Sequence, residues 1–265
     1  MNDRLNLSIE GRIRADILTA AHSAGRHGAH IAPSLSDAEI CLAVLEEFNR
    51  EKDSFILSKG HGALGYYAAM HQTGMITDKQ FASFEQDGGE FPGQPSRSVN
   101  NRVEYSSGSL GMGLSYGLGV ALGKRKTGGT VYIVVGDGEL NEGSIWEAAA
   151  LISQYGLDNV IVIVDNNGLQ SDGKCKDIVG RDIASLWAAY GWKVESCDGH
   201  SIVGLKEKLH SAHKERPLVI IANTVKGKGV SFMEHNNAWH HAILKDEDFQ
   251  IAMREIRKTY GLYEE

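Results

Sequence analysis

The stretch Thr130–Gly138, TVYIVVGDG, decides the fold. Thr130–Val135 is a continuous run of β-branched and aromatic residues, which is typical of a strand buried on both faces. Gly136 and Gly138 follow around Asp137. Glycines at a strand-to-helix turn let the backbone approach a ligand and present N–H groups to an anion. The stretch therefore predicts a buried strand that leads into an anion-binding turn.

The next residues predict a second strand after a helix. We expect a helix over Asn141–Tyr155 that stops at Gly156, and a buried strand over Val160–Val164. A strand, a helix and a strand within about 35 residues form a βαβ unit. Such a unit has parallel strands and a right-handed crossover.

The rest of the chain continues this alternation. Helices are predicted over Asp182–Tyr190, Ser201–Glu215 and Asp246–Tyr260, and strands over Trp192–Val194 and Leu218–Val225. The pattern predicts an α/β fold, a doubly wound and mainly parallel sheet with helices on both faces. Ligands of such sheets bind beyond the carboxyl ends of the strands.

Two capping boxes mark predicted helix starts in the first part of the chain. Ser36–Glu39 precedes an apolar-periodic stretch that continues to Phe48, and Thr77–Gln80 precedes Phe81. The segment Gly88–Arg102 is irregular and rich in Gly, Pro, Ser and Asn. It is long for a simple connection and predicts a functional or mobile loop.

The composition is that of a soluble globular protein. The chain has 265 residues, 42 % hydrophobic and 23 % charged, which fits one domain over residues 1–265. A net charge of −7 argues against a nucleic-acid binder, and no apolar run is long enough for a membrane span. The N-terminus lacks the apolar stretch of a signal peptide. Cys41, Cys175 and Cys197 show no metal or redox spacing, so free thiols in a reducing, cytoplasmic compartment are expected.

Polar turns follow two neighbouring predicted strands. Asp137 ends the first strand, and Asn167 follows the second, 30 positions later (167 − 137). Their oxygens, with the peptide carbonyl of Leu169, suit Mg²⁺ or Ca²⁺, and a diphosphate would bridge the metal and backbone N–H groups. Either turn alone is most simply a loop. Together, each after a buried strand, they predict a metal and diphosphate site.

This pair resembles the thiamine-diphosphate motif of the transketolase family. Further segments resemble that family's motifs in the same order, over about residues 10 to 250. The family patterns are L-S-x-G-H-G, G-S-L-G-Q-G, T-x-K-G-K-G and W-H-G, together with an earlier histidine that points at substrate. The matching segments are His30–Ser36 (HIAPSLS), Leu57–Gly62 (LSKGHG), Gly108–Gly113 (GSLGMG), Thr224–Gly229 (TVKGKG) and Ala238–His240 (AWH).

The resemblance implies a role for each matching position. Thiamine diphosphate would be held by residues of several turns, and Mg²⁺ or Ca²⁺ by three oxygen donors. The implied cofactor ligands are His61, Gly108, Ser109, Leu110, Gly136, Gly138, Asn167, Lys226 and His240, and the implied metal ligands are Asp137, Asn167 and Leu169. The implied substrate residues are His30, Gln94 and His240, and the implied catalytic residues are His30, His61, His240, Glu142 and Glu147.

Glu142 and Glu147 also have a simpler interpretation. Acids in the first turn of a helix favour its dipole, which is a sufficient structural reason for both. The family resemblance implies instead that they belong to a buried carboxylate path between paired active sites. Carboxylates that share protons in this way titrate interdependently.

Three departures from the family pattern bear on the substrate. Gln94 stands in a Gly-Gln-Pro segment where the family has Gly-His-Pro. An amide can hydrogen-bond, but it cannot relay a proton near neutral pH as imidazole can. Pro33 replaces a small polar residue, and Met112 replaces a glutamine. These departures leave the donor and acceptor sugars open.

The resemblance also implies a partner chain. Transketolases activate the cofactor with a glutamate of a later, pyrimidine-binding domain, and the sequence reaches Glu265 soon after the Trp239–His240 segment. We therefore expect the pyrimidine-binding and C-terminal domains on a second subunit, in an α2β2 heterotetramer. The implied reaction is transfer of a two-carbon ketol unit from a ketose or ketose phosphate to an aldose.

Other interpretations stay open at this point. A deoxyxylulose-phosphate-synthase-like fragment or a 2-oxo-acid dehydrogenase α chain would be related thiamine enzymes, although the latter is not expected to show Leu57–Gly62 as it stands. A non-catalytic thiamine-diphosphate-binding regulator would explain Gln94 as a sign of lost activity. The histidines that match no motif are predicted to be structural: His71, His200, His210 and His213.

Overall fold

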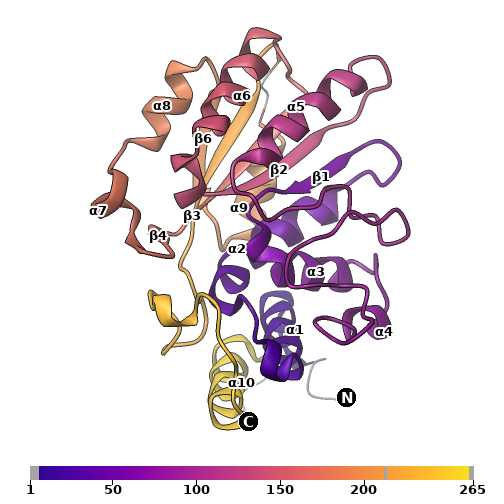
Figure 1. Cartoon of the computed structure of the whole chain (residues 1–265), viewed down its shortest axis with the longest axis vertical. Coiled ribbons are helices and arrows are strands. Elements are labelled where there is room, and N and C mark those ends of the chain that lie inside the picture. The colour runs from indigo at the N-terminus through magenta and orange to yellow at the C-terminus, as the bar shows by residue number, and fades with distance from the viewer. Residues whose placement is uncertain (1–5, 212–213, 263–265) are drawn as a thin grey trace.

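A parallel sheet organises the chain, whose computed structural model describes residues 6–211 and 214–262 (Figure 1). Neighbouring strands all run parallel, and the register pairs Gly136 with Asp165. The carboxyl ends of the second and third strands therefore lie side by side. In spatial order the strands are β1 (Ser54–Leu57), β2 (Val131–Gly136), β3 (Val160–Asn166), β7 (Leu218–Asn223) and β6 (Lys193–Asp198).

Helices bury both faces of this sheet. Along β2, Ile133 and Val135 pack into one apolar cluster, whereas Tyr132 and Val134 pack into another. Figure 1 shows α5, α6 and α8 on one face and α2 and α9 on the other, with α1 and α3 packed against α2 and α10 packed against α1. Burial on both faces explains the continuous apolar runs. The helices are α1 (Ile9–Ser23), α2 (Ile31–Glu47), α3 (Ala63–Gln72), α5 (Met112–Lys124), α6 (Gly143–Gln154), α8 (Ile183–Ala189), α9 (Ile202–Leu209) and α10 (Asp246–Tyr260).

The direction in which strands are added reverses after β6. From β1 through β2 to β3 the chain adds strands in one direction, and it then passes to β6 and returns through α9 to β7, next to β3. Open α/β sheets bind ligands beyond the carboxyl ends of their strands. The doubly wound parallel fold is thus confirmed, and it places the expected site after β2, β3 and β7.

Several predicted boundaries are shifted. β7 ends at Asn223, before the predicted Val225, and β6 continues to Asp198 beyond the predicted Val194. α9 ends at Leu209, short of the predicted Glu215, and residues 212 and 213 of that prediction lie outside the described part of the chain. The capping box at Thr77 is confirmed, since its side chain and that of Gln80 bond each other's backbone N–H.

The helix start predicted at Ser36 is wrong. α2 begins at Ile31, and Pro33 lies in its first turn, where a missing N–H costs no helical hydrogen bond. The Ser36 hydroxyl donates to Asp165 Oδ1 at 2.7 Å, so it makes a tertiary contact and caps nothing. The pattern misled because α2 is buried at every position from 31 to 45, and Ser36 and Glu39 bond to residues of other elements.

Short elements complete the described chain. Residues 88–102 contain no helix or strand, as predicted, and Ser98 forms an isolated bridge with Val103. No helix among the described residues is long and apolar enough to cross a membrane. The short elements are η2 (Gly25–His27), η3 (Gly60–Gly62), α4 (Asp78–Phe81), η4 (Gly138–Asn141), β4 (Leu169–Gln170), β5 (Gly173–Lys174), α7 (Cys175–Val179) and η5 (Asn237–Trp239).

Candidate cofactor site

Asp137 joins the turns after β2 and β3. Its carboxylate accepts the N–H of Gly138 at 2.7 Å and the N–H of Gly168 at 2.5 Å. Asp137 is only 6 % exposed. Burial and the neighbouring Asp165 carboxylate raise the pKa of Asp137 to about 6, in spite of these hydrogen bonds. No salt bridge to a described residue offsets its charge, so the carboxylate is placed to receive a cation.

Asn167 directs its amide oxygen toward the same turn. Its Nδ2 donates to Ser36 Oγ and to Asp165 Oδ2, each at 3.2 Å. Oδ1 therefore faces the other way and accepts the Leu169 N–H at 3.0 Å. Asp137, Asn167 and Leu169 line one cavity and offer oxygen donors of the kind that Mg²⁺ and Ca²⁺ prefer. Within the described ranges no group of three or more His, Cys, Asp or Glu side chains could hold a metal.

Gly138 permits this close packing of turns. A Cβ at this position would lie 2.7 Å from Gln170 Cβ, closer than real side chains approach. The absence of a side chain therefore lets β4 lie against the turn after β2. The approach of this turn to a ligand stays a prediction.

Three imidazoles face one another at this edge of the sheet. The ring centroids of His61 and His240 are 5.3 Å apart, and His30 lies 5.4 Å from His240 and 6.2 Å from His61. The buried Lys226 ammonium donates to Asn237 Oδ1 at 3.3 Å. The structure thus brings together the predicted histidines, which lie far apart in the sequence, with Lys226 beside them.

Burial keeps these imidazoles neutral. It lowers the pKa of His240 to about 3 and that of His30 to about 4, helped by Lys226, Lys59 and the other rings, and it also lowers the pKa of His61. The pKa of Lys226 falls to about 8 for the same reason. Nδ1 of His240 is buried and has no hydrogen-bond partner among the described residues. Because buried polar atoms are normally paired, this nitrogen fits a ligand.

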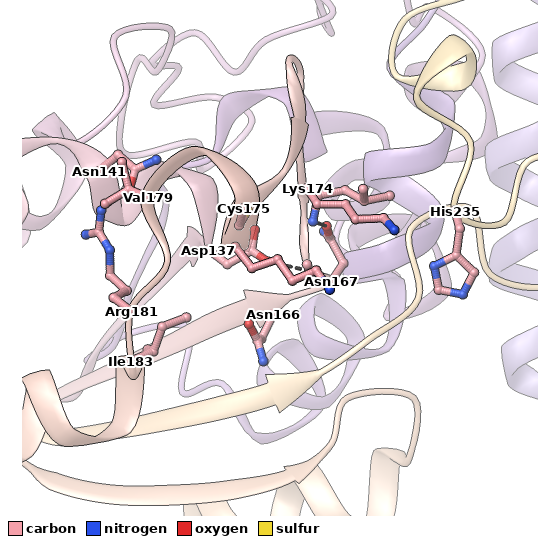
Figure 2. Close-up of a pocket in the computed structure, with 13 residues that line it drawn as sticks. Asp137, Asn141, Asn166, Asn167, Lys174, Cys175, Val179, Arg181, Ile183 and His235 are labelled. Atoms are coloured by element: carbon pink, nitrogen blue, oxygen red, sulfur yellow. Dashed lines mark hydrogen bonds between the residues drawn. The ribbon is translucent and has the colours of Figure 1, made fainter.

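Two cavities share the wall formed by Asp137, Asn167 and Leu169. The smaller, about 270 Å³, is also lined by His61, His240 and Lys226. The larger, about 510 Å³, is lined by Lys174, Cys175, Arg181 and His235, among others. Figure 2 shows Asp137 and Asn167 at its centre, with Arg181 to one side and His235 to the other. The predicted cofactor residues converge on the smaller cavity, which is the candidate cofactor site.

A buried ion cluster lies behind this site. Lys59 Nζ is 2.5 Å from Asp165 Oδ2 and 2.9 Å from Asp37 Oδ2, and it donates to the Pro33 carbonyl at 3.2 Å. Burial favours a raised pKa for both carboxyls. The ammonium and two hydroxyl donors outweigh it at Asp165 and lower that pKa, whereas burial prevails at Asp37 and raises its pKa to about 7.

Sequence reasoning missed this cluster and also Glu139. Glu139 is buried, which raises its pKa, and it accepts the Gly111 N–H at 2.7 Å, the Ser58 hydroxyl at 2.5 Å and the Gly136 N–H at 3.1 Å. It therefore fastens the turns after β1 and β2 to the start of α5. Lys59 and Asp165 lie inside recognised motifs, but no spacing rule shows that they meet.

The remaining predicted residues lie around the smaller cavity. Leu110 lines it, and Gly108 and Ser109 precede Leu110 on an exposed turn. Gln94 is exposed, and a Cβ built at Gly108 would lie 3.3 Å from its Oε1, so the amide borders this turn. Its contact with substrate stays a prediction.

The two glutamates of α6 are exposed in this chain by itself. Glu142, the N-cap residue of α6, lines the smaller cavity, while Glu147 lies one turn further along the helix. Their membership of a carboxylate path between paired sites therefore stays a prediction.

The histidines predicted to be structural pair with carboxylates away from the smaller cavity. His71 contacts Asp16 and Asp78 at 2.7 Å each, His200 contacts Glu39 at 3.0 Å, and His210 contacts Glu47 at 3.1 Å. His213 lies outside the described residues. The structure adds His241, which the motifs did not single out and whose ring centroid lies 4.6 Å from that of His30.

Known proteins match the chain over most of its length. Residues 27–265 match the family described as transketolase, thiamine diphosphate binding domain. The chain is 37 % identical to an apulose-4-phosphate transketolase subunit of Actinobacillus succinogenes, over 87 % of this chain and 88 % of that one. It is 32 % identical to a 6-deoxy-6-sulfo-D-fructose transketolase subunit of a Clostridium species, over 86 % and 88 %. Identity to human transketolase is 35 %, over 92 % of this chain and 41 % of the human protein.

Solved transketolases share the fold. A variant of the Pichia stipitis enzyme superposes with a TM-score of 0.82 at 22 % identity, over 99 % of this chain and 42 % of that one. The Campylobacter jejuni enzyme gives 0.80 at 22 % identity, over 99 % and 44 %. The family match and the relatives above 30 % identity identify the family as well as the fold. The chain therefore belongs to the transketolase family, as a thiamine-diphosphate-binding domain of a ketol-transferring enzyme.

Proposed function

We propose that this chain is the diphosphate-binding subunit of a two-chain transketolase. The proposal is carried by the convergence of Asp137, Asn167, His61 and His240 on one cavity. It is supported by the match, along most of both chains, with a relative that is itself named as one subunit of a transketolase. A second subunit would supply the pyrimidine-binding and C-terminal domains, in an α2β2 assembly.

A divalent metal fits the oxygen donors at the carboxyl ends of β2 and β3. Mg²⁺ or Ca²⁺ would be held by the Asp137 carboxylate, Asn167 Oδ1 and the Leu169 carbonyl, with positions left for diphosphate oxygens and water. The fit rests on two observations. Asp137 is buried without a salt bridge to a described residue, and the bonds from Asn167 Nδ2 leave Oδ1 on the side of Asp137 and Leu169.

Thiamine diphosphate fits the rest of the smaller cavity. His61, Lys226 and the unpaired Nδ1 of His240 would bind its diphosphate, and the glycines around Asp137 would let the backbone approach it. Residues 108–110 would contact the aminopyrimidine ring. When bound, this cofactor supplies the electron sink for breaking the bond beside a ketose carbonyl.

His30 and His240 would hold the sugar. Both are neutral near pH 7, since their pKa values are lowered to about 4 and about 3. A neutral imidazole accepts a hydrogen bond at one nitrogen and donates from the other, which suits a sugar hydroxyl. Gln94 would offer a donor and an acceptor at the rim. This complete set favours a catalytic subunit over a regulator that only binds the cofactor.

The relatives' names support a proposal for the substrate class. One relative is named for apulose 4-phosphate and another for 6-deoxy-6-sulfo-D-fructose, and both names describe sugars with an anionic group. We propose that the donor or acceptor of this chain is likewise a sugar with a phosphate or a similar anion. The ligands of that group would come mostly from the second subunit.

The outer face of α5 and α6 supports a paired assembly. Met112, Tyr116 and Leu151 are exposed by 47 %, 38 % and 46 %. Exposed apolar side chains on two neighbouring helices are typical of a protein contact surface. Glu142 and Glu147 are exposed at the start of α6, so a second copy packed here would bury them, as the proposed carboxylate path requires.

Reconstitution tests the proposal. The chain is expressed alone and together with a second chain that carries the pyrimidine-binding domain, and transfer from xylulose 5-phosphate and from sulfo- or phospho-ketoses to aldose acceptors is measured by chromatography. Turnover is expected only with both chains, thiamine diphosphate and Mg²⁺. Robust turnover by this chain alone would contradict the two-chain assignment, and no turnover by the complex with any donor would contradict ketol transfer.

An alanine variant tests the metal assignment within the same experiment. Asp137→Ala removes an oxygen ligand and leaves the diphosphate charge uncompensated, so calorimetric titration is expected to show no Mg²⁺-dependent thiamine-diphosphate binding. Asp177→Ala, which removes an exposed carboxylate of α7, is the matched control and is expected to bind normally. Wild-type affinity in Asp137→Ala would refute the metal site.

A further inference from the structure

His241 is the outermost ring of the histidine cluster. Its centroid lies 4.6 Å from that of His30, with the two planes at 74°. His30 in turn contacts His240 and His61, and within the described residues His241 has no ring contact with either of these. His30 therefore stands between His241 and the rings that line the cofactor cavity.

The backbone fixes this position. Ala29 and Ala242 form an antiparallel bridge, in which each N–H donates to the other carbonyl at 3.0 Å. In an antiparallel pairing, the residue after Ala29 lies opposite the residue before Ala242. His30 and His241 are thus direct cross-strand neighbours, in the type of pair whose side chains approach most closely.

Gly28 leaves room for the His241 ring. Its φ is +65°, and a Cβ there would lie 3.0 Å from His241 Cε1 and 3.0 Å from the Ala242 carbonyl oxygen. A side chain at this position would be strained at this φ and would crowd both the ring and the bridging carbonyl. The glycine and the bridge together hold His241 in place although its side chain is exposed.

The His241 side chain is also free to bind. Among the described residues no hydrogen bond or ion pair joins it to another side chain, and its ring contact is with His30. In the W-H-G pattern that Ala238–His240 resembles, the third position is glycine, and this chain has His241 there. The chain therefore lacks an imidazole at Gln94 but carries an additional one beside His30.

We propose that His241 is a specificity-determining residue, which contacts the part of the sugar beyond the two carbons that are transferred. The inference rests on the proposed function. A sugar whose reacting carbon lies near the cofactor cavity and whose hydroxyls meet His240 and His30 would extend next to His241. Imidazole there can bind a hydroxyl or an anionic terminal oxygen, so the favoured substrates are aldoses and ketoses with such a group beyond the first carbons.

Two acceptors of different length test this inference in the reconstituted complex. Glycolaldehyde has only two carbons and would end before His241, whereas D-erythrose 4-phosphate would extend to it. His241→Ala is expected to lower kcat/KM for erythrose 4-phosphate by about 10- to 100-fold, mainly through KM, the size of losing one polar substrate contact. Transfer to glycolaldehyde and the affinity for thiamine diphosphate are expected to stay unchanged.

Two further variants distinguish a direct contact of His241 with the sugar from indirect support of His30. His27→Ala removes an exposed imidazole of η2 and is expected to affect neither acceptor. His241→Gln keeps a hydrogen-bonding group and is expected to recover part of the loss. Equal losses with both acceptors would mean that His241 only supports His30, and unchanged kinetics with both would mean that it has no role. Either result overturns the proposal.

A binding measurement makes this test independent of turnover. The ring signals of His241, assigned with the His241→Ala variant, are followed by NMR while erythrose 4-phosphate is added to the complex, and they are expected to shift. If the wild-type complex transfers no ketol unit, the proposed function fails, but the ring signals still decide whether His241 meets the sugar. Signals that stay in place would overturn the inference in that case too.

Discussion

Two carboxylates of α2, Asp37 and Glu39, are equally buried and behave in opposite ways. Glu39 forms an ion pair with Arg14, and its other oxygen lies 3.0 Å from His200 Nδ1. Burial favours a raised pKa for Glu39, but these partners outweigh it and lower the pKa. Asp37 shares Lys59 with Asp165, and no described residue gives its oxygens an aligned hydrogen bond. Burial prevails there and raises the pKa of Asp37 to about 7.

This difference in pairing distinguishes a cluster that stabilises the fold from one that supports the candidate site. Arg14 also donates to the carbonyls of Glu10 and Lys228, so the Glu39 cluster joins α1, α2 and the segment after β7 with its charges paired. The Asp37 cluster continues through Asp165 to Asn167, the candidate metal ligand. Incompletely paired buried charge is costly and concentrates at functional sites. Burial alone therefore does not distinguish a structural buried charge from a functional one. The distinction lies in whether ion pairs and hydrogen bonds compensate the charge completely.

The largest expected effect falls on the paired cluster. Glu39→Gln leaves the buried Arg14 guanidinium without a counter-charge, and removing one partner of a buried ion pair typically costs about 3–5 kcal/mol. Urea denaturation of the chain should show a loss of this size. Thiamine-diphosphate affinity should stay unchanged, because no atom of this cluster lines the candidate site. A loss below about 1 kcal/mol, the level of a surface pair, would mean that the pairing of Glu39 does not stabilise the fold.

Lys59→Met should have a smaller effect on stability and a larger one on binding. It leaves two buried carboxylates without their ammonium, but Asp37 can take up a proton, so a loss of about 2–4 kcal/mol is expected. Asp165 then loses its counter-charge and holds Asn167 less firmly, and such supporting contacts are typically worth about 10- to 100-fold in metal affinity. Denaturation and calorimetric titration with thiamine diphosphate and Mg²⁺ measure the two effects.

Arg14→Met is the control for the lysine variant. It removes a cation that is equally buried, from the cluster that does not reach Asn167, so it should destabilise the chain without weakening cofactor binding. If both variants weakened binding to the same extent, general loosening of the fold would explain it. The two clusters would then not differ in function.

The same contrast shows what sequence can predict. The continuous apolar runs predict the central strands β2, β3 and β7, because a strand that is buried on both faces needs apolar residues at successive positions. The capping-box pattern of Ser36 and Glu39 predicts too late a start for the helix around Asp37, because these side chains bond to Asp165 and to Arg14. Local patterns predict local structure, and a helix buried on all sides uses its polar residues for distant partners.

The site was predictable where ligands come from motifs and not where they come from packing. Asp137 and Asn167 follow strands whose order and direction can be inferred, so their meeting follows from topology. Glu139 meets Gly111, and Asp37 meets Lys59, through contacts between separate elements that no spacing rule gives. His241 depends on a bridge between residues that are more than two hundred positions apart, Ala29 and Ala242.

The smallest expected effect concerns how the free energy of unfolding depends on pH. The contributions of Asp37 and Glu39 to this dependence have opposite signs. The pKa of Asp37 is raised from 3.8 to about 7, so between these values the unfolded chain binds fewer protons than the folded one, and stability falls as pH rises. Asp37→Asn removes this slope. The variant should lie within about 1 kcal/mol of the wild type near pH 5, since an amide replaces a protonated acid, and should gain relative to it up to pH 7.

Glu39→Gln should respond in the other direction. The folded pKa of Glu39 is lowered, so its stabilisation is fully present above the unfolded value of 4.5 and is lost as pH falls through the folded value. The cost of Glu39→Gln should therefore shrink in acid and stay constant from pH 5 to 8. Urea denaturation of both variants and the wild type at several pH values between 4 and 8 measures these slopes. If the Asp37→Asn difference is flat from pH 5 to 7, Asp37 is ionised like Glu39, and its incomplete pairing carries no excess free energy at the site.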